Sequence, residues 1–471
     1  MRSRAADDGW YAASAVAERR WPALAYDLDV DVCVVGGGLA GLTLAREVAR
    51  RGWSVALIEA GRIAGKASGR NTGFVLPGYA QDIRRIMERC GLAHAKALWA
   101  LSAAGVEYVR AAIRDTGMPG ANPVDGWLDV SKSDKADEIL PTLALLGQEF
   151  GVPFEWWPAE RLRAVLRSDR YFHALHYPTA FHIHPLNYAL GLAADAERMG
   201  ARIFEDTPAL AIDPTGVRKR VVTPRARLRC DHVVLAGNVH LGAAAPRLAG
   251  TVLAVWTHVA VTQPLGERLA QAIAYRGAVS DTHLADHHYR IVGGDRLMWS
   301  GGGSTFERDP RRRVEWLKRS IARTYPQLGE VEIAHVWSGA MGFAVHRMPQ
   351  IGEVAPGIWV ASAFAGHGLN TSAMAGELIA RAIVERDDTW RLFQPYDLVW
   401  AGGALGRAVM QASYWMGRAR ELAAARAARR REASRREDEA PSVEPAAARP
   451  PRPDAPRLAA SAQRRQRADV A

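Results

Sequence analysis

The clearest hydrophobic pattern lies in residues 28–59, where two short apolar runs flank a segment with helical spacing. The run "DVCVVGGG" is apolar, rich in β-branched residues and closed by glycines, which predicts a buried strand of a parallel sheet. Apolar residues three or four apart then follow from Leu39 to Val48 and end at Gly52, as in a helix with a glycine stop. "WSVALIEA" predicts a second buried strand, so the unit is strand, helix, strand.

The same alternation returns twice later in the chain. Residues 200–212 and 225–242 predict strands, and the helix between His184 and Gly200 precedes them. Residues 358–361 predict another strand, followed by a glycine turn and an amphipathic helix from about Thr371. These segments predict an α/β fold, α+β overall, with a Rossmann-like dinucleotide-binding domain.

Two stretches interrupt this alternation and predict a discontinuous second domain. They contain helical segments and strands such as "GWLDVSKS", which are consistent with an antiparallel or mixed sheet capped by helices. We therefore expect an N-terminal arm, a dinucleotide-binding domain in three segments, a substrate domain in two, a C-terminal helix and a basic disordered tail. The expected ranges are 1–27 for the arm; 28–80, 160–250 and 335–395 for the dinucleotide-binding domain; 81–159 and 251–334 for the substrate domain; 396–425 for the C-terminal helix; and 426–471 for the tail.

The C-terminal helix has apolar residues at positions 405, 409, 412 and 416. This spacing predicts an amphipathic helix, whose apolar side we expect to pack on the core rather than on a membrane. The following residues are charged, rich in proline and nearly free of large hydrophobic residues, which predicts disorder.

Charge and cysteine content exclude several classes of protein. The net charge of the 471 residues is +11, but residues 417–471 hold fourteen arginines against eight acidic residues, which leaves about +5 for the rest. The body is thus only mildly basic, and we expect no nucleic-acid partner. The three cysteines are far apart, so we expect neither a metal site nor a disulfide framework. With no long apolar stretch and no secretory pattern, we expect a cytoplasmic protein without a membrane span.

The glycines of the first turn predict a site for a dinucleotide. Gly36 permits the tight turn, Gly38 lets the backbone approach a pyrophosphate, and Gly41 allows helix and strand to pack closely. The pyrophosphate would meet the helix N-terminus. Glu59 follows 18 residues after Gly41, where a carboxylate accepts hydrogen bonds from a ribose. The acid disfavours NADP and leaves NAD and FAD open.

Three further segments favour FAD over NAD. Residues 65–74, "GKASGRNTGF", predict a loop of small residues where an NAD dehydrogenase would continue with another strand and helix. Gly237 ends a buried strand in a second glycine turn. The turn at Gly366–Gly368 aims a second helix N-terminus at the carboxyl edge of the sheet, where it would stabilise the negative charge of a reduced flavin ring.

These motifs together resemble the D-amino-acid-oxidase-like (DAO) superfamily of FAD-dependent oxidoreductases, and within it the gamma-glutamylputrescine oxidoreductase group. The resemblance covers nearly the whole chain. It rests on "WYAASA" (10–15), "ASGRNTG" (67–73), "HPLNYALGLA" (184–193), "VVLAGN" (233–238), "HRMPQIG" (346–352) and "GHGLNTSAMAG" (366–376).

The resemblance implies which residues contact FAD. Gly36, Gly38, Gly41 and Glu59 would hold the ADP half, and the backbone of Ala209 would meet the adenine. Ala67, Ser68 and Asn71 would lie at the pyrophosphate and flavin, and Gly366, Gly368, Asn370 and Thr371 at the pyrimidine side of the ring. "SGRN" contains no histidine, so we expect noncovalent FAD.

The resemblance also implies the reaction. We expect hydride transfer from the α C–H of a primary or secondary amine to flavin N5, followed by imine hydrolysis, on a polyamine catabolite such as gamma-glutamylputrescine. Relatives that oxidise sarcosine carry a lysine where this chain has Asn370, which favours an amine without a nearby carboxylate. The alternative within the same superfamily is an amino-acid oxidase or dehydrogenase of the sarcosine, glycine or D-amino-acid type. The alternative from another class is a nucleotide-binding protein that binds nucleic acid with its basic tail.

Candidate catalytic residues come from segments expected to border the flavin. His346, His367 and Tyr289 are the catalytic candidates, and His288, Tyr289 and Asn370 are the substrate-binding candidates. The electron acceptor would be oxygen or a dye or quinone.

Overall fold

The computed structural model describes residues 9–16, 19–134, 136–281 and 287–439. The chain forms two units, residues 1–425 and 426–471. The described part of the second unit, residues 426–439, is the end of helix α13 (Gly403–Glu439). Disorder was predicted from residue 426, which is wrong for this part because its alanines and arginines are good helix formers. The rest of the predicted tail lies outside the described residues.

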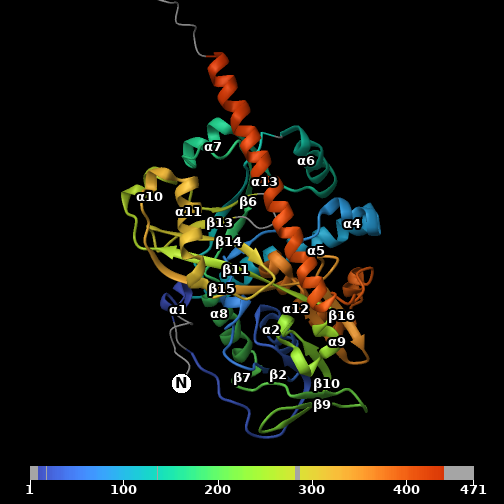
Figure 1. The fold of residues 1–471 in the computed structure, drawn as a ribbon. Coiled ribbons are helices and arrows are strands. Elements are labelled where there is room, and N and C mark those ends of the chain that lie inside the picture. The colour runs from blue at the N-terminus through green and yellow to red at the C-terminus, as the bar shows by residue number, and fades with distance from the viewer. Residues whose placement is uncertain (1–8, 17–18, 135, 282–286, 440–471) are drawn as a thin grey trace, which may run out of the picture. The chain divides into compact units, whose positions relative to one another are not determined.

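The first sheet has eight strands and contains the predicted strand–helix–strand unit (Figure 1). Its order is β16-β17-β10-β1-β2-β7, and the hairpin β8–β9 pairs with β10. The central strands from β17 to β7 run parallel, and β16 is antiparallel. The bounds are β1 Leu28–Val35, β2 Val55–Ile58, β7 Arg202–Phe204, β8 Ala211–Asp213, β9 Lys219–Val222, β10 Arg227–Leu235, β16 Gln350–Ala355 and β17 Ile358–Ser362.

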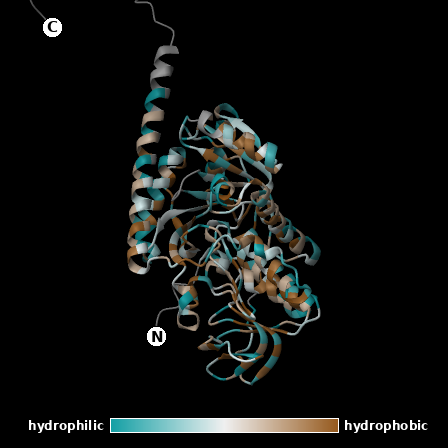
Figure 2. Ribbon diagram, turned by 90° about the vertical axis from the view of Figure 1, so that its right-hand side faces the viewer, coloured by the Kyte–Doolittle hydropathy of each residue, from teal (hydrophilic) through white to brown (hydrophobic). Residues whose placement is uncertain are grey.

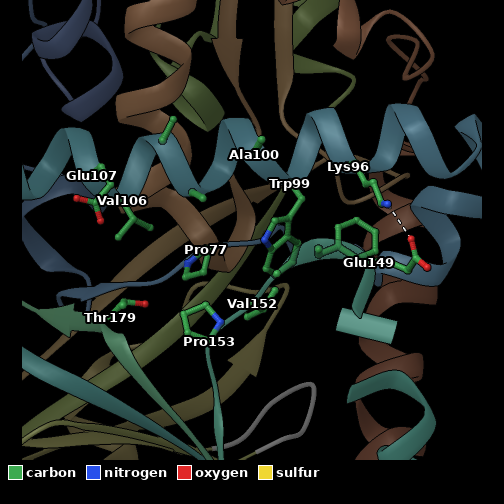
Figure 3. A pocket seen from close by; sticks show the side chains of 14 residues that line it. Pro77, Lys96, Trp99, Ala100, Val106, Glu107, Glu149, Val152, Pro153 and Thr179 are labelled. Carbon is green, nitrogen blue, oxygen red and sulfur yellow. Dashed lines mark ion pairs between the residues drawn. The ribbon is translucent and has the colours of Figure 1, made fainter. Parts of the chain in front are cut away.

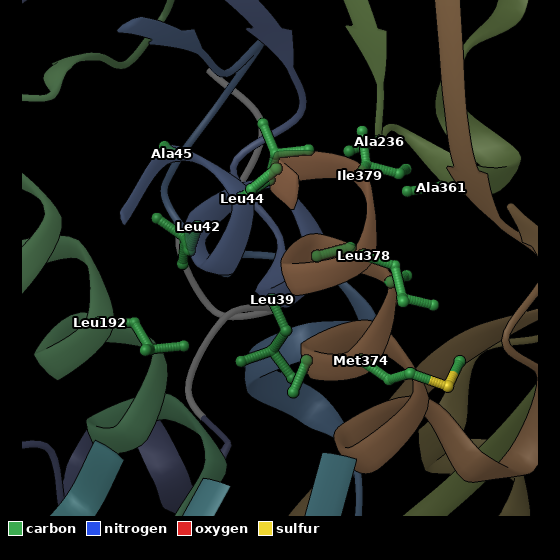
Figure 4. Close-up of a cluster of buried hydrophobic side chains, with 14 of the residues drawn as sticks. Leu39, Leu42, Leu44, Ala45, Leu192, Ala236, Ala361, Met374, Leu378 and Ile379 are labelled. Atoms are coloured by element: carbon green, nitrogen blue, oxygen red, sulfur yellow. The ribbon is translucent and has the colours of Figure 1, made fainter. Parts of the chain in front are cut away.

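Helices α2 (Leu39–Arg50), α8 (Pro185–Arg198) and α12 (Gly368–Glu385) build the main core beside this sheet. A Cβ on Gly376 of α12 would lie 2.7 Å from the Cβ of Thr43 of α2, so only a glycine lets the two helices approach this closely. Figure 4 shows apolar side chains of α2, α8 and α12 gathered in this core. Both α2 and α12 follow a central parallel strand, so their N-termini lie at the carboxyl edge of the sheet.

The second sheet has nine strands, in the order β15-β11-β14-β13-β12-β4-β6-β3, with β5 paired to β6. All its pairs are antiparallel except β12 with β4, so the prediction of an antiparallel or mixed sheet is confirmed. The bounds are β3 Phe74–Val75, β4 Val124–Ser131, β5 Glu155–Pro158, β6 His173–His182, β11 Leu253–Thr262, β12 Ala278–Asp281, β13 His288–Val292, β14 Arg296–Ser304 and β15 Ile333–Phe343.

The predicted domain boundaries are wrong at three strands. β3, β6 and nearly all of β15 fall in segments predicted for the dinucleotide-binding domain, yet they pair in the second sheet. Alternation along a strand shows that it has a buried side, but it does not show which sheet the strand joins. The chain therefore crosses between the two sheets more often than the sequence pattern indicates.

Further helices cover and connect the two sheets. In Figure 2 the ribbon changes between brown and teal along single helices, as expected for elements that bury one side. No helix in the described ranges is long and apolar enough to cross a membrane. The bounds are α1 Trp10–Ala13, α3 Ala67–Arg70, α4 Ile83–Cys90, α5 Leu92–Thr116, α6 Ala136–Phe150, α7 Ala159–Val165, α9 Pro246–Ala249, α10 Glu267–Ala272 and α11 Val314–Thr324.

The first part of α13 is oriented opposite to the prediction. Leu405, Val409 and Met416 are 72%, 60% and 55% exposed, while Gln411 and Tyr414 take the buried positions. The expectation that the apolar residues pack on the core is wrong. Helical spacing identifies an apolar side, but it does not determine whether that side faces the protein or the solvent.

Candidate active site

The glycine turn after β1 is packed so closely that side chains do not fit. A Cβ on Gly41 would lie 2.0 Å from the carbonyl oxygen of Gly36, and one on Gly36 would lie 2.7 Å from the backbone of Ala236. Gly36 also has φ +121°, a conformation that favours glycine. The N-terminus of α2 opens onto this turn, and its amide groups can face a pyrophosphate.

Glu59 lies at the turn, directly after β2. Its carboxylate accepts hydrogen bonds from the backbone N–H of Gly37 at 2.7 Å and of Gly61 at 2.9 Å. This position beside the first turn is the one from which an acid can accept hydrogen bonds from ribose hydroxyls. The sequence predicted the place of Glu59 but not its bond to the turn itself.

The segment predicted as a loop at residues 65–74 contains a one-turn helix, α3. The prediction is wrong there, because the Asn71 side chain donates to the carbonyls of Ala67 and Ser68 and satisfies the end of the turn. Ser68 Oγ accepts a hydrogen bond of 3.0 Å from the N–H of Leu39 at the start of α2. The structure thus brings Ser68 to the predicted pyrophosphate position.

Ala209 and Gly237 lie on opposite sides of the same turn. The N–H of Thr207 donates to the carbonyl of Glu59 at 2.8 Å, which brings the segment leading to Ala209 alongside Glu59. A Cβ on Gly36 would be 2.9 Å from the nitrogen of Gly237. The roles of both residues toward a cofactor stay predictions.

These residues fit the ADP part of FAD. The glycines leave room that a Cβ would fill, the N-terminus of α2 supplies amide donors, and Glu59 supplies an acceptor. Gly36, Gly38, Gly41 and Glu59 would therefore hold the dinucleotide.

The turn before α12 carries His367. Residues Ala365–His367 form a short 3-10 helix, and α12 begins at Gly368, three residues earlier than predicted. Thr371 donates its hydroxyl hydrogen to the carbonyl of His367. Burial, with a smaller effect of nearby His288, lowers the pKa of His367 to about 4, so its ring is neutral at pH 7.

The Asn370 side chain is buried where α12 meets α5. It is 1% exposed and its amide donates to the carbonyl of Ser102 in α5 at 3.3 Å. A Cβ on Gly105 of α5 would lie 2.3 Å from the carbonyl oxygen of Asn370. This side chain joins α12 to α5, and its contact with a substrate stays a prediction.

His346 is held by the backbone around it. Its Nδ1 accepts a hydrogen bond from the N–H of Met348 at 3.1 Å, which leaves Nε2 to donate to the carbonyl of Asp397 at 3.2 Å. Its ring lies 5.2 Å from that of Tyr396. Both ring nitrogens are thus engaged with the backbone and stabilise a turn, and the catalytic role of His346 stays a prediction.

His288 and Tyr289 point to opposite faces of the second sheet, as consecutive strand residues do. Tyr289 is 1% exposed and stacks on Trp299 with ring centres 4.4 Å apart. Its hydroxyl lies 3.1 Å from that of Tyr171 and 2.7 Å from that of Tyr325. Tyr289 belongs to the second core, which favours a structural role, and its catalytic and substrate-binding roles stay predictions.

We expect Tyr289→Phe to lower stability and leave activity nearly unchanged. Loss of the hydroxyl leaves the two partner hydroxyls without this bond inside the core, which costs about 1–3 kcal/mol. Chemical denaturation and steady-state assays at matched protein concentration measure the two effects. A loss of activity in protein that is fully folded would contradict this assignment.

The opposite face of the second sheet carries a group that we call the aromatic face: Phe74, Trp127, Asp129, Tyr177, Ser280 and His288. Across adjacent strands Asp129 pairs with Ser280, and Ser280 pairs with His288, so all three share one side. Ser280 Oγ lies 2.8 Å from His288 Nδ1 and accepts a hydrogen bond of 3.0 Å from Trp127 Nε1.

Asp129 is a candidate site residue that the sequence analysis did not single out. It is half-buried, and none of the described residues donates a hydrogen bond to its carboxylate. Burial, and secondarily the charge of Asp281, raises its pKa from 3.8 to about 8. The alternation of Trp127 and Asp129 with Leu128 and Val130 was a signal, but it is equally typical of a solvated strand face.

Trp127 and Tyr177 form an aromatic wall beside this carboxylate. Their rings stack with centres 4.8 Å apart, and the charge of Asp129 contributes to a raised pKa of Tyr177. A buried acid flanked by two aromatic rings suits an organic cation.

A cavity of about 370 Å³ is shown in Figure 3, and its lining residues Trp99 and Val152 belong to the same apolar cluster as Trp127 and Tyr177. Trp99 forms part of its wall, and Lys96 and Glu149 make an ion pair of 2.7 Å at its rim. Gly78 separates it from His367, since a Cβ there would lie 3.3 Å from the Trp99 ring and 3.8 Å from the His367 ring. In the described residues no group of three or more His, Cys, Asp or Glu side chains could hold a metal ion.

Comparison with known proteins agrees with this arrangement. Residues 31–382 match the family model of the DAO family, described as FAD dependent oxidoreductase. The chain is 33% identical to gamma-glutamylputrescine oxidoreductase of Escherichia coli over 388 aligned residues. The alignment covers 81% of this chain and 90% of that protein. It is 27% identical to a probable oxidoreductase, OrdL, of Haemophilus influenzae, over 80% of this chain and 88% of that one.

Solved structures share the fold. Glycine oxidase from Geobacillus kaustophilus aligns with a TM-score of 0.66 at 21% identity, over 79% of this chain and 99% of that one. L-Proline dehydrogenase from P. horikoshii aligns with a TM-score of 0.67 at 18% identity, over 79% and 98%. Given the matched family model over most of its length and the nucleotide turn described above, the chain belongs to the DAO family of FAD-dependent oxidoreductases.

Proposed function

We propose that this chain oxidises an amine that carries a charged group at its far end, of the γ-glutamylated diamine type. The observation that carries the proposal is Asp129, a carboxylate without a described hydrogen-bond donor, next to Trp127 and Tyr177 on the aromatic face. The similarity to gamma-glutamylputrescine oxidoreductase supports the same class of substrate.

Asp129 acts first, on the ammonium form of the substrate. An amine gives up its α C–H as hydride only when its nitrogen is neutral, so the ammonium proton must leave. A carboxylate with a pKa of about 8 binds the ammonium group and takes this proton more readily than an ordinary aspartate would. The rings of Trp127 and Tyr177 orient the cation beside it.

The bound FAD would supply the hydride acceptor for the α carbon, and hydrolysis of the resulting imine would give an aldehyde and ammonia. His367 stays neutral at working pH because its pKa is about 4, so it adds no positive charge that would repel the substrate. Ser280 holds His288 and Trp127 in place through its hydroxyl group.

The neighbouring cavity would take the far end of the substrate. A γ-glutamyl group ends in one ammonium and one carboxylate, and the cavity is lined by one cation, Lys96, and two carboxylates, Glu107 and Glu149. The cationic side chain of Arg290, two residues after His288 on the same strand, is held by His182 Nδ1, the Tyr11 hydroxyl and the carbonyl of Ile183.

Substrate screening tests the proposal. Anaerobic bleaching of the flavin absorbance should be fast with γ-glutamylputrescine, slower with putrescine and absent with glycine, sarcosine or D-alanine. Lys96→Met should raise KM for the γ-glutamylated amine about tenfold, because one charge-assisted contact is lost, and leave KM for putrescine unchanged.

The control is Arg84→Met, an exposed cation on the neighbouring helix α4 that is not part of the cavity wall. Bleaching by amino acids alone would establish the amino-acid oxidase alternative. An equal rise in KM for both amines in Lys96→Met would contradict the proposed place of the far end.

A further inference from the structure

The outward side of α13, within residues 403–425, presents large apolar side chains to solvent. Leu405, Val409 and Met416 lie on one side of this helix, and Trp415 beside them is 63% exposed. Trp400, just before the helix, is 70% exposed. We call these five residues the α13 outer face. Isolated exposed apolar residues are common, but five large ones on and beside one helix segment mark an interaction surface.

The opposite side of the same helix segment fixes this orientation. The Gln411 side chain accepts a hydrogen bond of 2.9 Å from the N–H of Thr305, and Tyr414 is buried. The guanidinium of Arg418 lies 4.8 Å from the centre of the Trp316 ring. Rotating the helix to bury the outer face would break all three contacts, so the exposure is a property of the folded chain.

Charge distinguishes between the partners that could cover this face. Arg407 and Arg420 are exposed on this segment, and residues 417–471 carry fourteen arginines against eight acidic residues. Two copies joined through this face would bring two such arginine-rich segments together, whereas an anionic surface would attract them. Exposed tryptophans beside aliphatic residues, flanked by arginines, are typical of helices that lie in the lipid–water interface.

We propose that the α13 outer face docks on the surface of an anionic lipid bilayer, with the helix lying in the plane of the interface. The apolar side chains enter the boundary between headgroups and acyl chains, and the arginines contact the lipid phosphates.

Docking at this place would bring the bilayer close to the candidate active site. On the inner side of α13, Tyr414 and Met410 belong to the same apolar cluster as Ala365, which starts the turn that carries His367. The turn that carries His367 would then lie one helix diameter, ~10 Å, from the lipid surface.

Vesicle co-sedimentation of the full holoenzyme tests the proposal. We expect binding to vesicles of equal parts phosphatidylcholine and phosphatidylglycerol, weak binding to pure phosphatidylcholine, and loss of binding at high salt. The triple variant Leu405→Gln, Val409→Gln and Met416→Gln keeps residues of adequate helix propensity and should bind at least about tenfold more weakly.

The matched control replaces two exposed apolar residues elsewhere, Leu210→Gln and Val217→Gln, which are 53% and 88% exposed. It should bind vesicles like the unchanged protein. The proposal is overturned if the unchanged protein ignores anionic vesicles, or if the triple variant binds them equally well. It is also overturned if light scattering shows a dimer that the triple variant dissociates while vesicle binding is absent. Amine oxidation in solution should be the same in all three proteins.

Discussion

Asp129→Asn is expected to lower kcat/KM for the amine substrate about 100-fold, equivalent to about 2.7 kcal/mol. The change keeps the size of the side chain but removes the charge that binds the ammonium group and the site that accepts its proton. A charge-assisted contact in a half-buried position loses energy of this order when one partner becomes neutral. Both kcat and KM should change, because binding and proton removal depend on the same carboxylate.

The pH profile gives an independent measurement of this role. Because the pKa of Asp129 is raised to about 8, the carboxyl group is protonated below that pH and ionised above it. In the unchanged enzyme, kcat/KM should therefore rise with pH through about 8. In Asp129→Asn this rise in kcat/KM near pH 8 should disappear. Only the rise that comes from deprotonation of the free amine should remain.

The free energy of unfolding should change with pH in the direction opposite to kcat/KM. The raised pKa means that the folded protein holds a proton on Asp129 between pH 3.8 and about 8, while the unfolded chain has released it. Stability thus falls as pH rises through this window, and Asp129→Asn removes that part of the slope. At pH 9 the variant should be more stable than the unchanged protein and yet less active, a combination that a merely structural residue does not produce.

Asp125→Asn is the matched control. Asp125 lies on the same strand, but its carboxylate is exposed and paired with Arg110 at 2.9 Å. We expect its kcat/KM and pH profile to stay close to those of the unchanged enzyme, because exposed ion pairs contribute little. If both variants lose activity equally, or if Asp129→Asn keeps the rise in kcat/KM near pH 8, the proposed role of Asp129 is wrong.

The sequence predicted the local fold around the expected dinucleotide turn, because that fold depends on the backbone of one short unit. Gly36, Gly41 and Glu59 lie within one strand–helix–strand unit, so local rules for turns, strands and helix ends place them together without knowledge of the rest of the fold. The membership of β6 in the second sheet depends instead on pairing with β4 and β5, and no local pattern contains that information.

The candidate site on the second sheet could not be predicted because it depends on which face of each strand points inward. His288 and Tyr289 are neighbours in sequence, and only the pairing of Ser280 with Asp129 and with His288 shows which of the two faces the candidate site. The same ambiguity explains α13, where the apolar side turned out to face solvent. A periodic pattern determines which residues share a side, and the direction of that side comes from the packing of the whole chain.

Gly41→Ala is expected to abolish FAD binding while leaving most of the fold in place. The added Cβ would lie 2.0 Å from the carbonyl oxygen of Gly36 and 3.1 Å from the Val34 side chain. A backbone oxygen cannot move away without opening the first turn, so α2 must shift from β1 and its amide groups leave the position of the pyrophosphate. We expect at least a 100-fold weaker affinity for FAD, or about 3 kcal/mol.

The measurement is titration of the FAD-free protein with FAD, followed by flavin fluorescence, with circular dichroism to confirm that helices and strands remain. Gly417→Ala serves as the control, because a Cβ at that helical position meets no atom within 4 Å and should leave FAD affinity unchanged. A second variant, Ser68→Ala, removes only the hydroxyl that accepts from the N–H of Leu39 and should weaken FAD binding by a smaller factor. Normal FAD affinity in folded Gly41→Ala would mean that the dinucleotide does not depend on the close approach of α2 to β1, and the assignment of this turn to the pyrophosphate would be wrong.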